Sequence, residues 1–466
     1  MPMSRSGRLR KADSALAWLS EAAASAPTTS RWIARNGVSV DFLPVAGVIS
    51  DRGQEVLRAV LIGVLAAMLL AVPAQAAFNP PTIVTGDDRG EPGIDVAGDG
   101  TIYVNAPAGL LSNLPGSPSD AYRSTDGGAT FTNTPKSLRA NLPGGGDSDI
   151  SIEPGTGKLF MTDLWLGSAT VSTSTDKGQS WLANPLQGVV VQDRQWIAAP
   201  GGDVSYHATH QIPLGLVVSK SQGGLAYPIS AVAATPVDQT GCICPPGNLI
   251  AQSGGGPLGL SDKVGLIYAT STGGVKFAQS TNGGLTFANV DIAPASSATT
   301  NANFPVVANA GSNKLVAVWQ EVVGNGTRIR FSSSSNWGAS WAAPKTIVSA
   351  GTSVYPWVDA RGSKVSVTLY HTDAAGTPEA VPAGAQWFES YLESTDGGST
   401  FSGLETVDST PAKTGPICTE GINCSEGRDL LDFQSVALDP QNRANATWTH
   451  VITNGSDTEL RFARQP

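Results

Sequence analysis

The stretch Ser124-Thr-Asp126-Gly-Gly128-Ala-Thr130-Phe131 decides the fold, because its pattern returns along the chain. The pattern reads Ser-x-Asp/Asn-x-Gly-x-Thr/Ser-aromatic. Four further copies are Ser174–Trp181, Ser280–Phe287, Ser334–Trp341 and Ser394–Phe401. A degenerate copy lies at Ser219-Lys-Ser221-Gln-Gly223. Self-similarity at intervals of this size indicates repeated supersecondary units that stack on one another. The sequence therefore predicts an array of similar units.

The residue types in this motif favour a tight turn between two strands. An Asp or Asn side chain accepts hydrogen bonds from backbone amides a few residues further on, and Gly adopts the positive φ that such a turn requires. The Ser and Thr hydroxyls add local bonds, and the aromatic side chain packs where the next strand begins. We therefore interpret the acidic residues of the motif, such as Asp126, as turn residues and not as catalytic groups.

This motif is the Asp box, and through it the chain resembles the sialidase-like, BNR-repeat β-propeller superfamily over essentially all of residues 78–466. The resemblance implies an all-β fold in which four-stranded blades surround a central channel. It also implies that each Asp box joins the third and fourth strands of its blade.

The spacing of the boxes predicts the number of blades. Their central residues are at positions 126, 176, 221, 282, 336 and 396, and one more unit follows, with strands expected at 432–439, 443–451 and 459–464. That last unit lacks a fourth strand. Residues 78–84 resemble 341–348, the fourth strand of an earlier blade, so we expect the N-terminal strand to close the ring and protect two sheet edges. Seven blades are predicted, with six, as in sialidases, as the alternative.

An apolar block near the N-terminus predicts a targeting segment. Arg52 and Arg58 precede the uncharged run 59–72, and Ala74-Gln75-Ala76 has the small-x-small pattern of a cleavage site. The run is shorter than the ~20 residues of a membrane-spanning helix, which is the alternative. We interpret 1–50 as an extension that precedes the true start or is disordered, 51–76 as a signal peptide, and 77–466 as a secreted, extracellular β-propeller domain.

The charge of the chain excludes some classes of partner. Residues 1–76 hold eight of the 29 basic and five of the 38 acidic residues, which leaves the remainder with a net charge of about −12. Nucleic acids and anionic membranes favour basic surfaces, so neither is expected as a partner. No P-loop, Rossmann fingerprint or nucleophile elbow occurs, and no cofactor or metal is expected. The resemblance implies a glycan or polysaccharide partner, which includes sialylated glycans, and a monomer.

The four cysteines predict disulfides. They occur as Cys242-Ile-Cys244 and as Cys418 with Cys424, and an even number in an exported protein is typical of disulfide bonding. Three pairings are open: pairing within each local group, or either of two cross-links between the groups. A zinc site built from all four thiolates is the functional alternative, although the Cys-x-Cys spacing differs from the usual zinc knuckle.

The resemblance also directs attention to the starts of the innermost strands, where propellers of this kind meet ligands. Sialidases hold the substrate carboxylate with three arginines, whose planar guanidinium groups pair well with carboxylates. Arg89, Arg194 and Arg428 occupy three such positions. Sialidases also use a tyrosine nucleophile, which the resemblance places at Tyr355. The candidate catalytic acids are Asp193, Asp429 and Glu91.

The sequence departs from the sialidase pattern in its first blade. Asp88-Arg89-Gly90-Glu91-Pro92 has one residue more between Arg and Pro than the Arg-Ile-Pro motif of that family. Two hypotheses follow. An exo-acting glycoside hydrolase of the exo-α-sialidase type, acting on anionic glycans, requires the three arginines to converge beside a tyrosine or two carboxylates. A non-catalytic propeller that binds a polysaccharide or a protein at the channel mouth requires the arginines to be bridged by neighbouring acids.

Overall fold

The computed structural model describes residues 31–33, 39–41, 78–107, 119–134, 146–165, 167–188, 191–235, 246–294 and 304–466. The chain divides into two compact units, Met1–Gln75 and Ala76–Pro466. In the first unit, β1 (Arg31–Ile33) pairs antiparallel with β2 (Ser39–Asp41). Among the described residues, no helix is long and apolar enough to cross a membrane.

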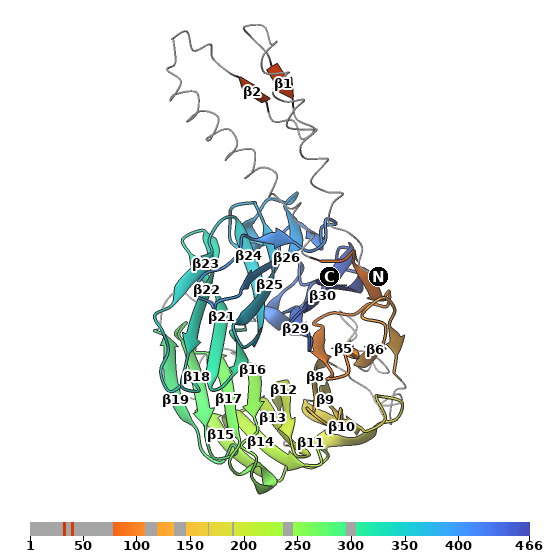
Figure 1. The fold of residues 1–466 in the computed structure, drawn as a ribbon, viewed down its shortest axis with the longest axis vertical. Coiled ribbons are helices and arrows are strands. Elements are labelled where there is room, and N and C mark those ends of the chain that lie inside the picture. Colours follow the sequence, from red (N-terminus) through yellow and green to blue (C-terminus); the bar gives the residue numbers. More distant parts are fainter. Residues whose placement is uncertain are drawn as a thin grey trace, which may run out of the picture. The chain divides into compact units, whose positions relative to one another are not determined.

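The second unit is a ring of seven antiparallel sheets, which we call blades 1–7 (Figure 1). Blades 1–3 consist of β4 (Gly93–Val96), β5 (Ile102–Ala106), β6 (Asp120–Ser124) and β7 (Thr132–Asn133); β8 (Gly146–Ile152), β9 (Leu159–Trp165), β10 (Ser168–Ser174) and β11 (Leu182–Gln187); and β12 (Gln192–Gly201), β13 (Val204–Gln211), β14 (Gly215–Gln222) and β15 (Ile229–Ala234).

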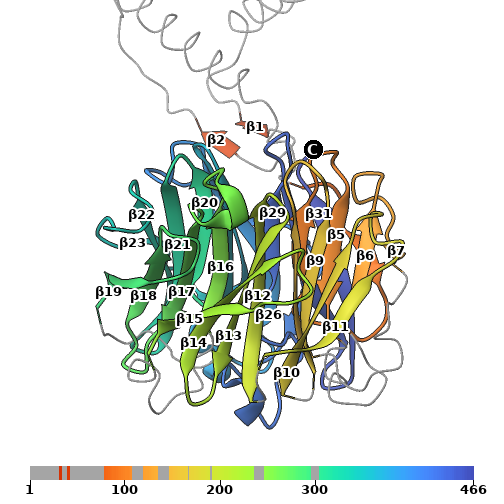
Figure 2. The same cartoon turned by 90° about the horizontal axis from the view of Figure 1, so that it is seen from below.

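Blades 4–6 follow the same order. They consist of β16 (Pro246–Gln252), β17 (Lys263–Ala269), β18 (Val275–Ser280) and β19 (Ala288–Ala293); β20 (Val306–Gly311), β21 (Lys314–Val323), β22 (Gly326–Ser334) and β23 (Lys345–Val348); and β24 (Thr352–Arg361), β25 (Lys364–Thr372), β26 (Gln386–Ser394) and β27 (Glu405–Thr406), with β28 (Lys413–Thr414) also paired to β26. Seen from the side, the strands run between two faces of the ring (Figure 2).

Blade 7 joins the two ends of the ring. It contains β29 (Ser435–Leu438), β30 (Ala444–Thr453), β31 (Asp457–Arg464) and, as its fourth strand, β3 (Thr82–Thr85). The register places Thr82 opposite Phe462 and Ile83 opposite Arg461. The predicted all-β, seven-bladed propeller closed by the N-terminal strand is therefore confirmed, and the six-bladed alternative is excluded.

The Asp boxes form the turns between the third and fourth strands, as predicted. In blade 6, the carboxylate of Asp396 accepts hydrogen bonds from Ser394 Oγ at 2.7 Å and from the Thr400 amide at 2.9 Å. Gly398 has φ +88°, and a Cβ there would lie 2.2 Å from the Phe331 ring. Glycine is therefore required by both the backbone and the packing. We call the face that carries these turns the Asp-box face, and the opposite one, where the inner strands begin, the mouth face.

Buried side chains link the inner strands of neighbouring blades. Asp95 accepts a hydrogen bond from the Ile152 amide of blade 2 at 2.8 Å, and Asp149 accepts one from the Ile197 amide of blade 3 at 2.8 Å. Between blades 4 and 5, Asn248 performs the same role by accepting from the Val307 amide at 2.8 Å and donating to its carbonyl at 2.9 Å. We call these contacts the inner-strand bridges. The bond to the amide of the next blade needs one acceptor oxygen, so an amide side chain can form it as a carboxylate does. The other oxygen of Asp149 accepts from the Ile150 amide at 3.0 Å.

The bridges predict a pH-dependent contribution to stability. Burial raises the pKa of Asp149 to about 7, against about 3.9 for an unfolded Asp. The folded state therefore binds more protons than the unfolded state between about pH 4 and pH 7. The stability that protonated Asp149 contributes to the folded state is lost as pH rises through that window. Asp149→Asn removes this titration and retains the bridge, as Asn248 does.

The quantity to compare is the free energy of unfolding of Asp149→Asn minus that of the wild type. We expect this difference to increase by up to about 1.4 kcal/mol for each unit of pH between about pH 4 and pH 7. Urea unfolding curves at several pH values measure this difference. A difference that stays constant with pH would show that Asp149 does not titrate in this window.

Candidate site at the mouth of the channel

Three of the sequence-predicted site residues share an unusual backbone conformation. Glu91, Arg194 and Tyr355 have φ values of +47°, +41° and +52°, and Leu431 beside them in blade 7 has +56°. Residues other than glycine rarely adopt this left-handed backbone conformation, and those that do are concentrated at functional sites. Each residue lies at the start of an inner strand. The ladder also shifts register between Asp193 and Trp196 in blade 3 and between Val354 and Trp357 in blade 6.

An aromatic cluster fills the ring beside these residues. It consists of Trp196, Phe304, Trp357 and Phe433, from blade 3, the segment before β20, blade 6 and the segment before β29, with ring centroids 5.3–6.1 Å apart. The guanidinium carbon of Arg194 lies 3.8 Å from the centroid of Trp196 and 4.4 Å from that of Phe433. A cation over aromatic faces is stabilised by the ring quadrupoles. Arg194 is 2% exposed, so it belongs to the interior of the ring.

Two of the three predicted arginines converge on one carboxyl group. Arg194 Nη1 lies 3.4 Å from Glu91 Oε2, and Arg428 Nη2 lies 3.8 Å from Glu91 Oε1. Arg428 also pairs with both oxygens of Asp432, at 3.2 and 2.6 Å. Asp147 Oδ2 is 3.8 Å from Arg194 Nη1. These contacts cross from blade 1 to blades 2, 3 and 7 and tie the ring together at its mouth.

Two neighbouring carboxyl groups, those of Asp147 and Asp193, complete the site. The carboxyl group of Asp193 lies close enough to that of Asp147 for the charge of Asp147 to raise its pKa. Asp193 also accepts a hydrogen bond from the backbone amide of Arg194 at 2.9 Å. We call Glu91, Asp147, Asp193, Arg194, Arg428 and Asp432 the mouth cluster. Its most exposed members include Arg428 and Asp147, whose side chains are 25% and 23% exposed.

Burial and like charges favour the neutral form of two of these acids. Burial, together with the charges of Asp147 and Asp432, raises the pKa of Glu91 well above its usual range, against the opposing effect of the two arginines. Burial and the neighbouring Asp147 raise the pKa of Asp193 to about 6. Asp432 and Glu91 in turn raise the pKa of the Arg428 guanidinium. Glu91 and Asp193 therefore release their protons at a higher pH than exposed carboxyl groups do.

Arg89 and Asp429 have partners outside the mouth cluster. Arg89 Nη2 pairs with Asp120 Oδ2 at 2.5 Å, and its Nε donates to the Tyr122 hydroxyl at 3.3 Å. Asp429 forms a buried ion pair with Lys413, with both side chains at most 3% exposed, and accepts a bond from the Gly455 amide. The structure thus gives Arg89 a role within blade 1 and gives Asp429 a role beneath the loops of blades 6 and 7.

Tyr355 is buried under a disulfide-closed loop. Its side chain is 2% exposed, and its hydroxyl donates to the carbonyl of Cys418 at 3.4 Å. Burial, reinforced by Asp432, raises the pKa of this phenol well above its usual value. Cys418 is bonded to Cys424, which agrees with the local pairing among the alternatives. Cys242 and Cys244 lie outside the described residues. The described residues contain no group of three or more His, Cys, Asp or Glu side chains suited to a metal ion.

No family model matches the chain, and no curated protein matches its sequence. Among solved structures, it is similar to the α-L-arabinofuranosidase Arb93A of Fusarium graminearum, with 14% identity and a TM-score of 0.44 over 84% of this chain and 96% of that enzyme. It is also similar to the NanB sialidase of Streptococcus pneumoniae, with 12% identity and a TM-score of 0.41 over 86% and 72%.

A third similar structure is YCF48 from Cyanidioschyzon merolae, with 14% identity and a TM-score of 0.47 over 82% of this chain and 98% of that protein. Similarities of this strength assign neither an activity nor a ligand to this chain. The ring itself, with four-stranded blades and Asp boxes between their third and fourth strands, confirms the resemblance to sialidase-like β-propellers at the level of the fold.

The pairing of Asp429 with Lys413 predicts a structural role for this carboxylate. Asp429→Asn removes the counter-charge of a buried ammonium group, so we expect the free energy of unfolding to fall by about 3–5 kcal/mol. Chemical denaturation followed by tryptophan fluorescence measures the loss. The double variant with Lys413→Met should recover much of it. A loss below about 1 kcal/mol, as for an exposed pair, would contradict this assignment.

Proposed function

We propose that this protein is a non-catalytic β-propeller that binds a neutral saccharide at the mouth cluster. The observation that carries the proposal is the occupation of both arginines: Glu91 lies between Arg194 and Arg428, and Asp432 engages Arg428 from a second side. A sialic acid carboxylate needs guanidinium groups that are free to pair with it. Here the protein's own carboxyl groups already supply the partners.

The charge balance of the cluster supports the same choice of ligand. Four carboxyl groups lie around two guanidinium groups, so even with Glu91 and Asp193 protonated the cluster has no net positive charge to attract an anionic ligand. Carboxylates are strong hydrogen-bond acceptors, and sugar hydroxyls are donors that carry no charge. Asp147 and Arg428, an acceptor and a donor that are both partly exposed, suit the mixed donor and acceptor pattern of a sugar ring.

A hydrolase is the second candidate, and two observations favour it. Asp193 has a pKa of about 6 next to another carboxyl group, and acid–base catalysis uses a carboxylic acid that stays protonated near neutral pH. Glu91, Arg194 and Tyr355 also retain a left-handed backbone that is costly to maintain. In this case the substrate class would be a glycoside, and the exo-α-sialidase form would require Arg194 and Arg428 to leave their present partners.

Binding and turnover assays on the purified protein separate these candidates. We expect neutral oligosaccharides on a glycan array to bind and sialylated ones not to bind. In calorimetric titrations with the tightest neutral oligosaccharide, Asp147→Asn should weaken affinity by about tenfold, because a neutral amide oxygen is a weaker acceptor for a sugar hydroxyl than a carboxylate. Asp291→Asn, an exposed position in blade 4, is the matched control and should bind as the wild type does.

Two outcomes would overturn the proposal. Binding restricted to sialylated oligosaccharides would do so, because it requires arginines that are free for the ligand. Release of 4-methylumbelliferone from a sialoside or from a panel of neutral aryl glycosides would favour the hydrolase. Loss of sialoside turnover in both Arg428→Ala and Tyr355→Phe would then assign the arginine clamp and the phenol nucleophile.

We further propose that the protein is exported, with residues 51–76 as a signal peptide. The basic residues before the apolar run 59–72 and the Ala74-Gln75-Ala76 pattern support this. N-terminal sequencing of the protein recovered from the culture medium of an expressing bacterium should find Ala77 as the first residue. Recovery of the uncleaved chain in the membrane fraction would favour an anchor instead.

A further inference from the structure

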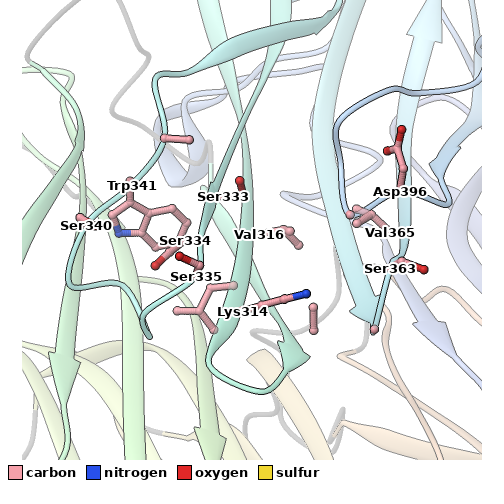
Figure 3. Close-up of a pocket in the computed structure, with 15 residues that line it drawn as sticks. Lys314, Val316, Ser333, Ser334, Ser335, Ser340, Trp341, Ser363, Val365 and Asp396 are labelled. Atoms are coloured by element: carbon pink, nitrogen blue, oxygen red, sulfur yellow. The ribbon is translucent and has the colours of Figure 1, made fainter.

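A groove opens on the Asp-box face between blades 5 and 6, on the opposite side of the ring from the mouth cluster. Its volume is about 500 Å³. Figure 3 shows Trp341 and Ser335 of the blade 5 turn on one wall, Ser363 and Asp396 of blade 6 on the other, and Lys314 between them. The groove therefore combines an indole ring, hydroxyl groups, an ammonium group and a carboxylate.

The other blades explain why a groove exists at this place. A lysine lies at or directly before the start of the second strand in blades 2, 4, 5 and 6: Lys158, Lys263, Lys314 and Lys364. In blade 2, Lys158 Nζ donates to Asp203 Oδ1 of blade 3 at 2.6 Å. In blade 4, Lys263 donates to Asn313 of blade 5. Both partners directly precede the second strand of the next blade.

Blade 6 breaks this rule, because Ser363 occupies the position that Asp203 and Asn313 hold elsewhere. The serine side chain is shorter and carries no charge. Within the described residues, Lys314 has neither a hydrogen-bond partner nor an ion-pair partner, in contrast to its counterparts in blades 2 and 4. The missing side chain thus leaves both an open space and an unpaired ammonium group that lines it.

The other lining groups favour a sugar as the occupant. Trp341 offers a partly buried aromatic ring on one wall of the groove. The bonds that Asp396 accepts within its turn hold its pKa well below its usual range, so this carboxylate remains ionised and accepts from hydroxyl donors. Ligand sites of this kind join an apolar face to a few polar groups that fix orientation.

We propose that this groove is a second ligand site, which takes a uronic acid unit. Lys314 pairs with the sugar carboxylate, the ring lies against Trp341, and the sugar hydroxyls bond to Ser363 and Asp396. The site is independent of the mouth cluster and of the function proposed for it.

Calorimetric titration of the intact protein tests the site with three probes: trigalacturonate, the neutral maltotriose and the acidic peptide triglutamate. We expect trigalacturonate to bind more tightly than both other probes. Binding of maltotriose that Ser363→Asp weakens as much as it weakens binding of trigalacturonate would overturn the selection for charge by Lys314. Equal binding of triglutamate would overturn the assignment to a saccharide, and no binding of trigalacturonate at millimolar concentration would overturn the site.

The substitution Ser363→Asp provides the sharpest variant, because it restores the partner that Asp203 gives Lys158. We expect it to weaken trigalacturonate binding by at least about tenfold while the melting temperature is unchanged or higher. The control Asn133→Asp adds the same charge at an exposed position of β7 in blade 1, and it should bind trigalacturonate as the wild type does. Unchanged affinity in Ser363→Asp would overturn the proposal. If that variant fails to fold, Lys314→Met must give the same loss for the proposal to stand.

Discussion

The hydrogen bonds that pass from one inner strand to the next hold this structure together. Asp95, Asp149 and Asp359 each reach across to a backbone amide of the following blade, and Asn248 does so with an amide side chain. A buried backbone amide without a partner would be costly, and the space between two blades contains few other acceptors. These contacts fix the angle between neighbouring blades, and that angle determines where each inner strand begins. The pairing of β3 with β31 then closes the ring.

The mouth cluster depends on this ring, because no single blade supplies it. Glu91 comes from blade 1, Asp147 from blade 2, Arg194 from blade 3 and Arg428 from the loop before β29. Opposite charges brought together in the interior must pair closely, since an unpaired buried charge is strongly destabilising. The aromatic cluster around Arg194 lowers the exposure of these groups further. The ion pairs that connect the blades at the mouth of the ring therefore leave Arg194 and Arg428 already paired, so they are not free to bind an anionic ligand.

The sequence predicted the fold well because its decisive signals are local. The Asp boxes fix turns within eight residues, and the likeness of residues 78–84 to 341–348 identified the closing strand. The sequence also placed Glu91 and Arg194 near the starts of inner strands, and in the structure Arg194 Nη1 lies 3.4 Å from Glu91 Oε2. The Cys418–Cys424 bond joins cysteines six residues apart, which made the local pairing one of the natural choices.

Which charged side chains pair with one another could not be predicted from the sequence, because the pairing depends on how the strands and loops pack together. Nothing near Asp429 indicates that Lys413, sixteen positions earlier, is its counter-ion. Arg89 resembled the other two arginines in position, yet its partner Asp120 comes from the third strand of its own blade. The left-handed backbone at Tyr355 leaves no signature in composition, and the loop that covers it is positioned by contacts such as the Thr419 hydroxyl with Glu379 at 2.5 Å.

A crystal structure of the protein soaked with sialic acid and, separately, with a neutral oligosaccharide tests the central claim most directly. The account predicts that Arg194 stays beside Glu91 and Arg428 stays paired with Asp432 in both crystals, and that only the neutral sugar is seen, in contact with Asp147 and Arg428. A sialic acid carboxylate bound by Arg194 and Arg428, with Glu91 and Asp432 displaced, would contradict it and would identify the mouth as an anion-binding site.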